Sequence, residues 1–373
     1  MNFSEIPGLV EQKRALISSL KTSHVAHAQL FYGVEGSASL PLALAYAQYL
    51  NCENPKESDS CGECASCHKM KKFIHPDLHF LMPLAATADM KKGDKKKELM
   101  MMWRNFLIEQ PFGSSQDWIA SHGAKNSQLN ISVDEARALA SPLFLKSNEG
   151  RYKIAFIWLA EFMNAASANM LLKILEEPPG DTVFLLVSND YEKILPTILS
   201  RVQLNFVPLF SDEEILGYLT THYPEKEEID LIKAQYLGEG NLGKAMKIVE
   251  NSDFGDFEFF MDWMRKCYSN DFSNILKLGE QFSALGREKQ KEVLHSGIKL
   301  FREVLVASAK TNLTRVSPEI KDSFEKFVSA INKENLEKIY KSLNDSVYHI
   351  ERNANPQISF LNTSIFLSSV IRK

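Results

Sequence analysis

Short apolar runs alternate with longer amphipathic stretches over the first 208 residues of the chain. The runs at 29–32, 154–159 and 183–187 are largely apolar, which predicts strands buried on both faces. The stretches at 10–21, 40–50, 131–145 and 160–177 predict helices, and Pro178 and Pro179 end the last of them. Apolar strands separated by helices indicate a parallel sheet covered on both sides. We therefore predict an α/β nucleotide-fold domain over residues 1–208.

The pattern becomes helical after residue 208. Residues 211–250 have helical periodicity interrupted by Gly238 and Gly240, which predicts a small helical domain over 209–252. From 253 to 373 there are no clear strand signals, and helices are predicted at 257–268, 272–285, 290–309 and 334–343. Residues 253–373 are therefore predicted to form an all-helical third domain.

The alternation of strands and helices is interrupted between residues 84 and 131. A basic run lies in this segment, at Lys91, Lys92, Lys95, Lys96 and Lys97. Blocks of like charge usually stay solvated, so an exposed surface loop is favoured over a DNA contact. Four aromatic residues follow, at Trp103, Phe106, Phe112 and Trp118. They belong either to the core or to a partner surface, and core packing is the favoured interpretation.

Composition limits the partners and the compartment of the protein. The 373 residues carry a formal net charge of -4, so any DNA contact has to be local or shared with partner proteins. The N-terminal segment lacks the apolar core of a signal peptide, and no apolar run approaches the ~20 residues that a membrane span needs. We expect a soluble cytoplasmic protein that has no membrane partner.

The cysteines indicate a metal site. Cys52, Cys61, Cys64 and Cys67 have the spacing C-x8-C-x2-C-x2-C, which offers four thiolates to one tetrahedral zinc ion. Thiols stay reduced in the cytoplasm, so metal ligands are favoured over disulfides. Four thiolate ligands leave no coordination position for substrate, and the expected role of zinc is structural. An iron–sulfur cluster or free thiols are the alternatives. Cys267 lies alone in a helical stretch and is expected in the core.

A loop with two glycines joins the first predicted strand to the helix at 40–50. Gly33 and Gly36 resemble the frame of a phosphate-binding loop, but Ala38, Ser39 and Leu40 stand where such a loop has Gly, Lys and Ser/Thr. Ser39 cannot supply the ammonium that holds the phosphates, and Leu40 cannot supply the hydroxyl that binds Mg²⁺. We expect no ATP at this loop. A chance Gly-x-x-Gly turn is the alternative.

Several motifs occur in a characteristic order. They are Ala-His-Ala-Gln-Leu-Phe at 26–31, the cysteine segment, His-Pro-Asp at 75–77, and the strings at 131–137, 150–153, 169–179 and 195–201. This series resembles the bacterial DNA polymerase III clamp-loader subunits of the gamma/tau and delta-prime type, which are AAA+ proteins. Order and spacing agree over roughly the first 250 residues, apart from the lysine-rich insertion. The string at 350–356 also resembles the collar domain of that family.

Departures from the family pattern favour the delta-prime type, which does not hydrolyse ATP. Trp158 and Leu159 stand where the family's ATPases have the Asp-Glu pair of a Walker B motif, and Gly243 stands at the arginine of the second nucleotide sensor. Ser200-Arg201 matches the family's Ser-Arg-Cys motif with Val202 at the third position. The resemblance implies that Arg201 acts as a trans arginine finger in a neighbour's ATP site. The alternative for Arg201 is a surface salt bridge.

The resemblance implies a subunit of the polymerase III holoenzyme without its own ATPase activity. Residues 209–252 would form a lid and residues 253–373 a collar that assembles with gamma/tau and delta subunits. The complex would act on the sliding clamp and primer-template DNA, and the single-stranded DNA-binding machinery is a further expected partner. One alternative is an ATP-hydrolysing gamma/tau-type motor. Another is a zinc-dependent DNA-binding module that acts alone, against which the net acidity weighs.

Overall fold

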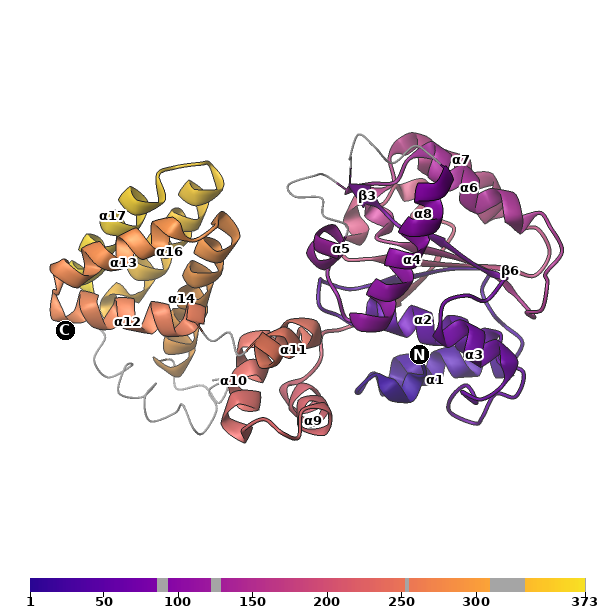
Figure 1. The fold of residues 1–373 in the computed structure, drawn as a ribbon, viewed down its shortest axis with the longest axis horizontal. Coiled ribbons are helices and arrows are strands. Elements are labelled where there is room, and N and C mark those ends of the chain that lie inside the picture. The colour runs from indigo at the N-terminus through magenta and orange to yellow at the C-terminus, as the bar shows by residue number, and fades with distance from the viewer. Residues whose placement is uncertain (86–92, 122–128, 252–254, 309–332, 373) are drawn as a thin grey trace. The chain divides into compact units, whose positions relative to one another are not determined.

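The computed structural model describes residues 1–85, 93–121, 129–251, 255–308 and 333–372, and Figure 1 labels their elements. These residues form two compact units. The first contains Met1–His222 and Gly238–Lys244, and the second contains Tyr223–Leu237 and Ala245–Lys373. The division into domains at 1–208, 209–252 and 253–373 stays a prediction.

The first unit is built on a five-stranded parallel sheet in the order β2-β5-β6-β1-β7. Its strands are β1 (Ala28–Tyr32), β2 (Leu78–Leu81), β5 (Lys153–Trp158), β6 (Thr182–Ser188) and β7 (Gln203–Phe206). Every residue of β5 and β6 is buried, which explains why these strands have continuous apolar sequences. The predicted parallel α/β sheet is confirmed. A separate antiparallel pair joins β3 (Leu84–Ala85) to β4 (Leu129–Asn130).

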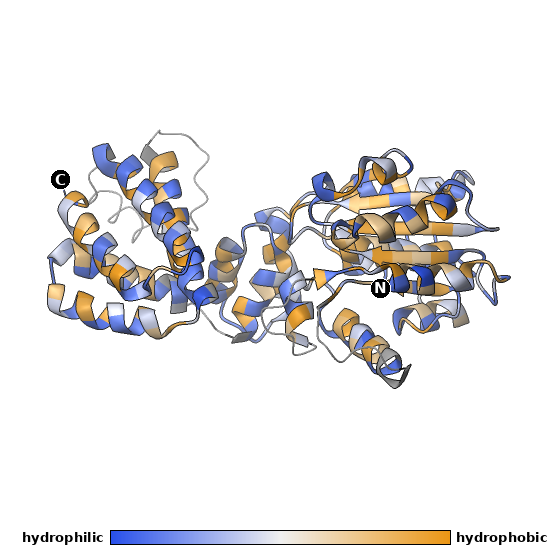
Figure 2. Cartoon of the chain, turned by 90° about the horizontal axis from the view of Figure 1, so that it is seen from above, coloured by the Kyte–Doolittle hydropathy of each residue, from blue (hydrophilic) through white to orange (hydrophobic). Residues whose placement is uncertain are grey.

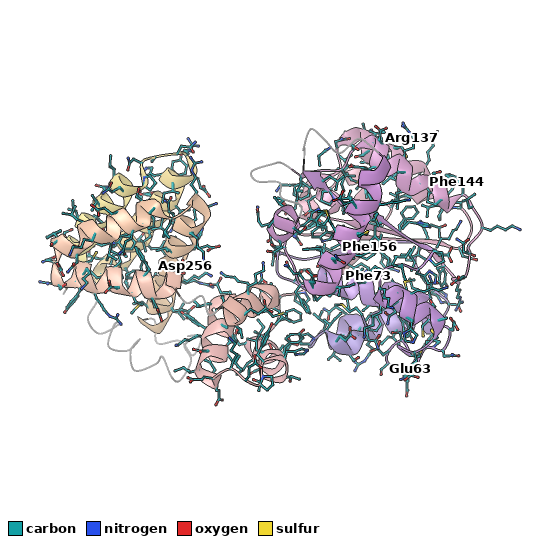
Figure 3. All side chains as sticks on the ribbon, in the orientation of Figure 1. Glu63, Phe73, Arg137, Phe144, Phe156 and Asp256 are labelled. Carbon is teal, nitrogen blue, oxygen red and sulfur yellow. The ribbon has the colours of Figure 1, made fainter. Side chains whose placement is uncertain are left out.

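Helices cover both faces of the sheet in the first unit. Helix α2 (Ser39–Leu50) packs on one face together with α1 (Val10–Lys21), and α6 (Val133–Leu143) and α7 (Ala165–Glu176) pack on the other (Figure 1). The remaining helical elements are η1 (Phe3–Glu5), α3 (Ala65–Lys71), α4 (Gly93–Glu109), α5 (Ser115–Ser121), η2 (Ala160–Phe162), η3 (Tyr191–Lys193), α8 (Pro196–Leu199) and α9 (Asp212–His222). In Figure 3, Phe156 lies inside these layers and Glu63 lies at the surface.

The described part of the second unit is helical, with a core of its own. Its elements are α12 (Gly255–Ser269), α13 (Phe272–Ala284), α14 (Arg287–Ser308), η4 (Lys333–Asn335), α16 (Leu336–Glu351) and α17 (Pro356–Val370). The helices α10 (Glu228–Gly238) and α11 (Leu242–Asn251) contribute residues to both units. Trp263 stacks on Phe360 with ring centroids 4.2 Å apart, and its indole N–H donates to Ser364 Oγ at 2.8 Å. Cys267 is fully buried in this core, as predicted.

Apolar residues concentrate on the strands of the sheet and on the inner sides of helices (Figure 2). None of the helices described here combines the length and the apolarity of a membrane span.

Two sequence-based predictions are corrected by the structure. The helix predicted at 160–177 begins only at Ala165, because Leu159 adopts a left-handed conformation and Asn164 caps α7 by accepting a hydrogen bond from Ser167 N. The basic run is not a loop where it is described: Lys95, Lys96 and Lys97 lie in α4. Lys91 and Lys92 lie outside the described residues.

Candidate functional site

The loop between β1 and α2 lies at the carboxyl edge of the sheet, where ligands bind in folds of this class. Its backbone requires both glycines. A Cβ on Gly33 would lie 2.2 Å from the carbonyl oxygen of Val207, and Gly36 has a φ of +96° that other residues rarely adopt. The loop therefore has a fixed, tightly packed backbone, although the sequence motif is incomplete.

The side chains from Ala38 onward, where α2 begins, are turned into the protein. Ser39 is 1% exposed, and its hydroxyl lies 2.8 Å from the hydroxyl of Ser37. Leu40 is also buried, like every other residue of α2. No residue from Gly33 to Leu40 carries a cationic side chain. The loop can offer backbone N–H groups and serine hydroxyls to an anion, but no positive charge of its own.

The segment before α11 closes over this loop. Asn241 caps α11, where its Oδ1 accepts a hydrogen bond from Lys244 N at 2.9 Å. The same side chain fills the space beside Gly36, since a Cβ there would lie 2.3 Å from Asn241 Cγ. Gly243 lies against the insertion, and a Cβ at Gly243 would meet the carbonyl oxygen of Phe112 at 2.2 Å. An arginine at position 243 would have no room in this packing.

Trp158 ends β5 inside an aromatic cluster. Its ring centroid lies 4.9 Å from that of Trp103 and 5.6 Å from that of Phe106. Trp118 completes the cluster and donates its indole N–H to Pro83 O at 2.8 Å. The predicted core role of Trp103, Phe106 and Trp118 is confirmed, because each is at most 3% exposed. Phe112 is only half-buried, and its ring packs on those of Phe210 and Tyr218 instead of joining the buried cluster. Aromatic rings from the segment between residues 84 and 131 thus cover the end of β5. A carboxylate buried among these rings would lose its hydration at a large cost in free energy.

Glu161 is the acidic residue closest in sequence to this strand end. Its Oε1 accepts a hydrogen bond from Asn189 N at 3.0 Å, just after β6. The other oxygen is buried and has no hydrogen-bond partner among the described residues. Burial raises the pKa of the Glu161 carboxyl. Glu161 is therefore held against the backbone of the next strand end.

The four cysteines predicted as metal ligands meet in one cluster. Their Sγ atoms all lie within 4.8 Å of one another, although Cys52 follows α2 and the other three lie around the start of α3. Backbone N–H groups point at the sulfurs: Cys61 N donates to Cys52 Sγ at 3.2 Å, and Cys64 N donates to Cys61 Sγ at 3.3 Å. Such bonds stabilise thiolates. Burial opposes this effect at Cys61, but the N–H donors lower the pKa of its thiol to about 6. The cluster can bind a metal ion such as zinc.

The cysteine segment is fastened to the N-terminal residues. The Asp59 carboxylate accepts hydrogen bonds from Phe3 N at 3.0 Å and from Ser4 N at 2.9 Å. Gln48, near the end of α2, donates to Ser60 Oγ at 2.8 Å. The cysteine cluster is therefore joined to the main body of the first unit at several points.

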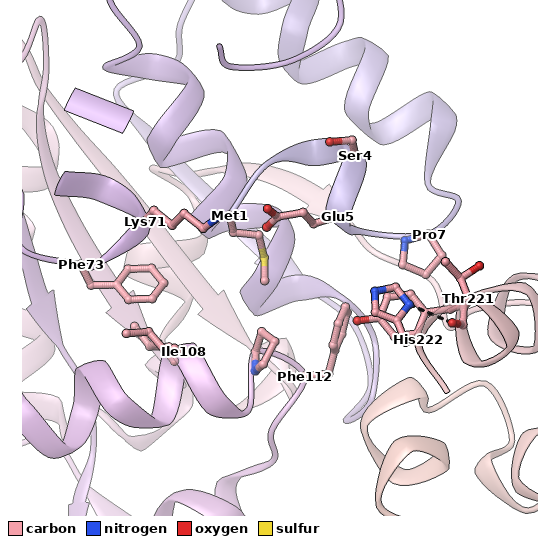
Figure 4. Close-up of a pocket in the computed structure, with 13 residues that line it drawn as sticks. Met1, Ser4, Glu5, Pro7, Lys71, Phe73, Ile108, Phe112, Thr221 and His222 are labelled. Atoms are coloured by element: carbon pink, nitrogen blue, oxygen red, sulfur yellow. Dashed lines mark hydrogen bonds between the residues drawn. The ribbon is translucent and has the colours of Figure 1, made fainter. Parts of the chain in front are cut away.

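A cavity of about 670 Å³ opens next to this junction (Figure 4). Its apolar side includes Phe73, Ile108 and Phe112, and its polar side includes Glu5 and Lys71. The wall on the α9 side is held by His222, whose ring stacks on Tyr218 with centroids 3.8 Å apart. Sequence reasoning did not foresee this cavity, because its wall combines η1, α3, α4 and α9.

Arg201 lies just after α8, at the surface of the first unit. Its side chain is 33% exposed and forms an ion pair with Glu176, the last residue of α7. Its Nε donates to Glu176 Oε1 at 2.6 Å, and its Nη1 donates to Thr197 O at 2.7 Å. The surface salt bridge considered as the alternative is therefore present. The guanidinium is also accessible from outside the unit.

Comparisons with known proteins support the resemblance seen in the sequence. The family described as "DNA polymerase III, delta subunit" matches residues 9–209. A DNA polymerase III subunit delta' of Pseudomonas aeruginosa is 32% identical over 223 residues, which cover 60% of this chain and 56% of that protein. A subunit delta' of Escherichia coli is 25% identical over 248 residues, which cover 66% of this chain and 62% of that protein.

Other relatives bear different subunit names. A DNA polymerase III subunit gamma of Buchnera aphidicola is 26% identical over 255 residues, which cover 67% of this chain and 58% of that protein. A crystal structure of a DNA polymerase III, gamma subunit-related protein from Thermotoga maritima has a TM-score of 0.39 at 17% identity and covers 96% of this chain and 99% of that chain. The chain thus spans about six-tenths of the length of the curated relatives it matches. Because the family matches more than half of the 373 residues, this chain belongs to the DNA polymerase III delta-subunit family, with several subunits delta' among its relatives.

Proposed function

We propose that this chain is a non-hydrolysing, delta-prime-type subunit of the DNA polymerase III clamp loader. In that role it binds no ATP at its own loop and contributes Arg201 to the ATP site of a neighbouring gamma/tau subunit. The assembled loader would open the sliding clamp and place it on primer-template DNA. The proposal rests on the family match and on the similarity to subunits delta'.

The observation that carries the proposal is the contrast between two sites of the first unit. The segment Gly33–Leu40 has no cationic side chain, and the end of β5, two strands from β1 in the sheet, carries Trp158 in an aromatic cluster instead of a metal-binding acid. Arg201, in contrast, keeps its guanidinium at the surface. A chain with an arginine at its surface, but no cation at its own loop, suits a role in the ATP site of a neighbouring subunit.

Arg201 would act through its charge. Hydrolysis of ATP develops negative charge on the phosphoryl oxygens, and a guanidinium placed beside them stabilises the transition state. The planar N–H donors of arginine match phosphate oxygens better than a lysine ammonium does. The neighbour supplies Mg²⁺ and its own phosphate loop, so this chain has to provide only position and charge.

The other parts of the chain would have supporting roles. We assign residues 1–208 to a degenerate AAA+ domain, 209–252 to a lid and 253–373 to a collar that holds the gamma/tau and delta subunits. Zinc is the metal we propose for Cys52, Cys61, Cys64 and Cys67, because four thiolates form a closed tetrahedral set. It would stiffen the segment that anchors the N-terminal residues.

The test is ATP hydrolysis by the reconstituted loader, stimulated by clamp and primed DNA. An arginine finger accelerates hydrolysis by about 10³-fold or more at the one ATP site that it contacts. We therefore expect Arg201→Ala to lower the ATP turnover of the whole loader by at least about tenfold. Assembly, measured by gel filtration, should be unchanged. The matched control is Arg137→Ala, which removes another exposed arginine from an ion pair on α6. Turnover of Arg201→Ala equal to that of the control would overturn the proposal.

A further inference from the structure

Arg201 pairs within this chain through the edge of its guanidinium that carries Nε and Nη2, which is the edge that would bind an oxyanion. Nε donates to Glu176 Oε1 at 2.6 Å, and Nη2 forms the ion pair with the same oxygen. Nη1 faces α8 and the residue after it instead, where it donates to Thr197 O at 2.7 Å and to Ser200 Oγ at 3.1 Å. A carboxylate and a phosphate prefer the same two-pronged edge of arginine. In this pose the Glu176 carboxylate occupies that edge.

The position of Glu176 has no evident role in its own helix. Glu176 is the last residue of α7, and Glu177 is the C-cap. The carboxyl end of a helix carries partial negative charge, so a carboxylate there is electrostatically unfavourable. Pairing with Arg201 compensates for this. Both side chains are partly exposed, with 33% for Arg201 and 46% for Glu176, so the pair can open without disturbing the core.

We infer that Glu176 stows Arg201: it holds the guanidinium on this chain until the γ-phosphate of a neighbour's nucleotide displaces the carboxylate. This inference rests on the proposed function of Arg201. Glu176 is then a positioning residue, which acts on the neighbour's reaction only through Arg201. The exchange conserves charge pairing, since one anion replaces another on the same guanidinium.

The expected size of the effect follows from the exposure of the pair. Exposed ion pairs contribute an equilibrium factor of up to about fivefold, so removing the competing carboxylate should help the finger by about two- to fivefold. The gain should appear in kcat/KM for ATP, because the competition with Glu176 has to be overcome between the free loader and the transition state.

The experiment compares Glu176→Gln with the native chain in the reconstituted loader. Glutamine keeps the size of the side chain and removes its charge. We expect kcat/KM for ATP to rise by about two- to fivefold. The matched control is Glu177→Gln, which removes the same charge one residue later, at an exposed position, and should leave kcat/KM unchanged. In an Arg201→Ala background, Glu176→Gln should have no effect, because a positioning residue needs the residue that it positions.

The outcomes separate the inference from the proposed function. If the loader that contains Arg201→Ala hydrolyses ATP slowly, but Glu176→Gln leaves kcat/KM for ATP unchanged or lowers it, the arginine-finger role stands and the stowing role is wrong. An equal rise in both Glu176→Gln and Glu177→Gln would also overturn stowing, since it would reflect general surface charge. If the loader that contains Arg201→Ala hydrolyses ATP as fast as the loader with the native chain, the arginine-finger role and the stowing role both fail.

Discussion

The two ends of helix α2 differ in what they can bind. Before the helix, the loop at 33–38 has a tightly packed backbone but no cationic side chain. After it, the cysteine segment brings together four sulfurs with N–H groups directed at them. Both ends are held by the same element, in which every residue is buried. The helix therefore supports a site with a full ligand set at one end and a site without charge at the other.

This difference shows that the residues that fix the backbone conformation of a site need not be the residues that supply its ligand-binding groups. The shape of the loop follows from Gly33, Gly36 and the burial of α2, and none of these needs a bound nucleotide. A structural metal is different, because its binding free energy is part of the folding free energy. Changes at the cysteine segment should therefore cost stability, whereas changes at the loop should cost stability only where they disturb packing.

The largest effect is expected at the cysteine segment. Cys61→Ser should abolish zinc binding and lower the free energy of unfolding by about 3–5 kcal/mol, because loss of a structural metal is among the most severe single changes. A shift of the melting temperature by about 10 °C would correspond to that loss. Zinc content by elemental analysis and thermal unfolding would measure both. Chelation of zinc from the native chain should give a similar shift.

His68→Ala is the control for this change. His68 adjoins Cys67 but is exposed, and its loss should leave zinc content and melting temperature unchanged. A Cys61→Ser protein that keeps its zinc, or that melts with the native chain, would contradict the structural role of the cluster. The cysteine segment would then have no more binding function than the loop before α2, and the contrast between the two ends of α2 would disappear.

The next effect concerns the frame of the loop. Gly33→Ala should lower the free energy of unfolding by about 2–4 kcal/mol, because its Cβ would lie 2.2 Å from the backbone carbonyl oxygen of Val207. Chemical denaturation would measure the loss. Gly217→Ala is the matched control, since a Cβ there meets nothing within 4 Å and the residue lies in α9. That change should stabilise the protein by about 0.5–1 kcal/mol. Equal stabilities of the two variants would show that the loop is not tightly packed.

Much of the first unit could be predicted because its strands are buried on both faces. The apolar runs of β1, β5 and β6 are visible without any knowledge of neighbours. Strand β7 was missed, since it has the burial pattern of an edge strand with Leu204 and Phe206 exposed. The break before α7 was missed for another reason: Leu159 takes a left-handed conformation that its residue type does not signal.

The candidate sites were predictable to the extent that they are local in sequence. The spacing of the four cysteines predicts their cluster, and the residues after Gly36 already show that the loop lacks a cation. The pairing of Arg201 with Glu176 and the packing of Asn241 on Gly36 join residues far apart in the chain. Such contacts depend on how the elements pack, and no local pattern encodes them.

The smallest effect is expected where Asn241 closes the loop. Asn241→Ala removes the cap of α11 and should lower the free energy of unfolding by about 1 kcal/mol. Asn241→Ser keeps a capping hydroxyl while it vacates most of the space beside Gly36, so it should be close to native in stability. Neither variant should bind Mg²⁺-ATP tightly in a titration of the isolated chain, because opening the space supplies neither a cation nor a metal-binding acid. Tight binding by Asn241→Ser alone would mean that the loop is blocked rather than chemically incomplete. The two ends of α2 would then differ only in access.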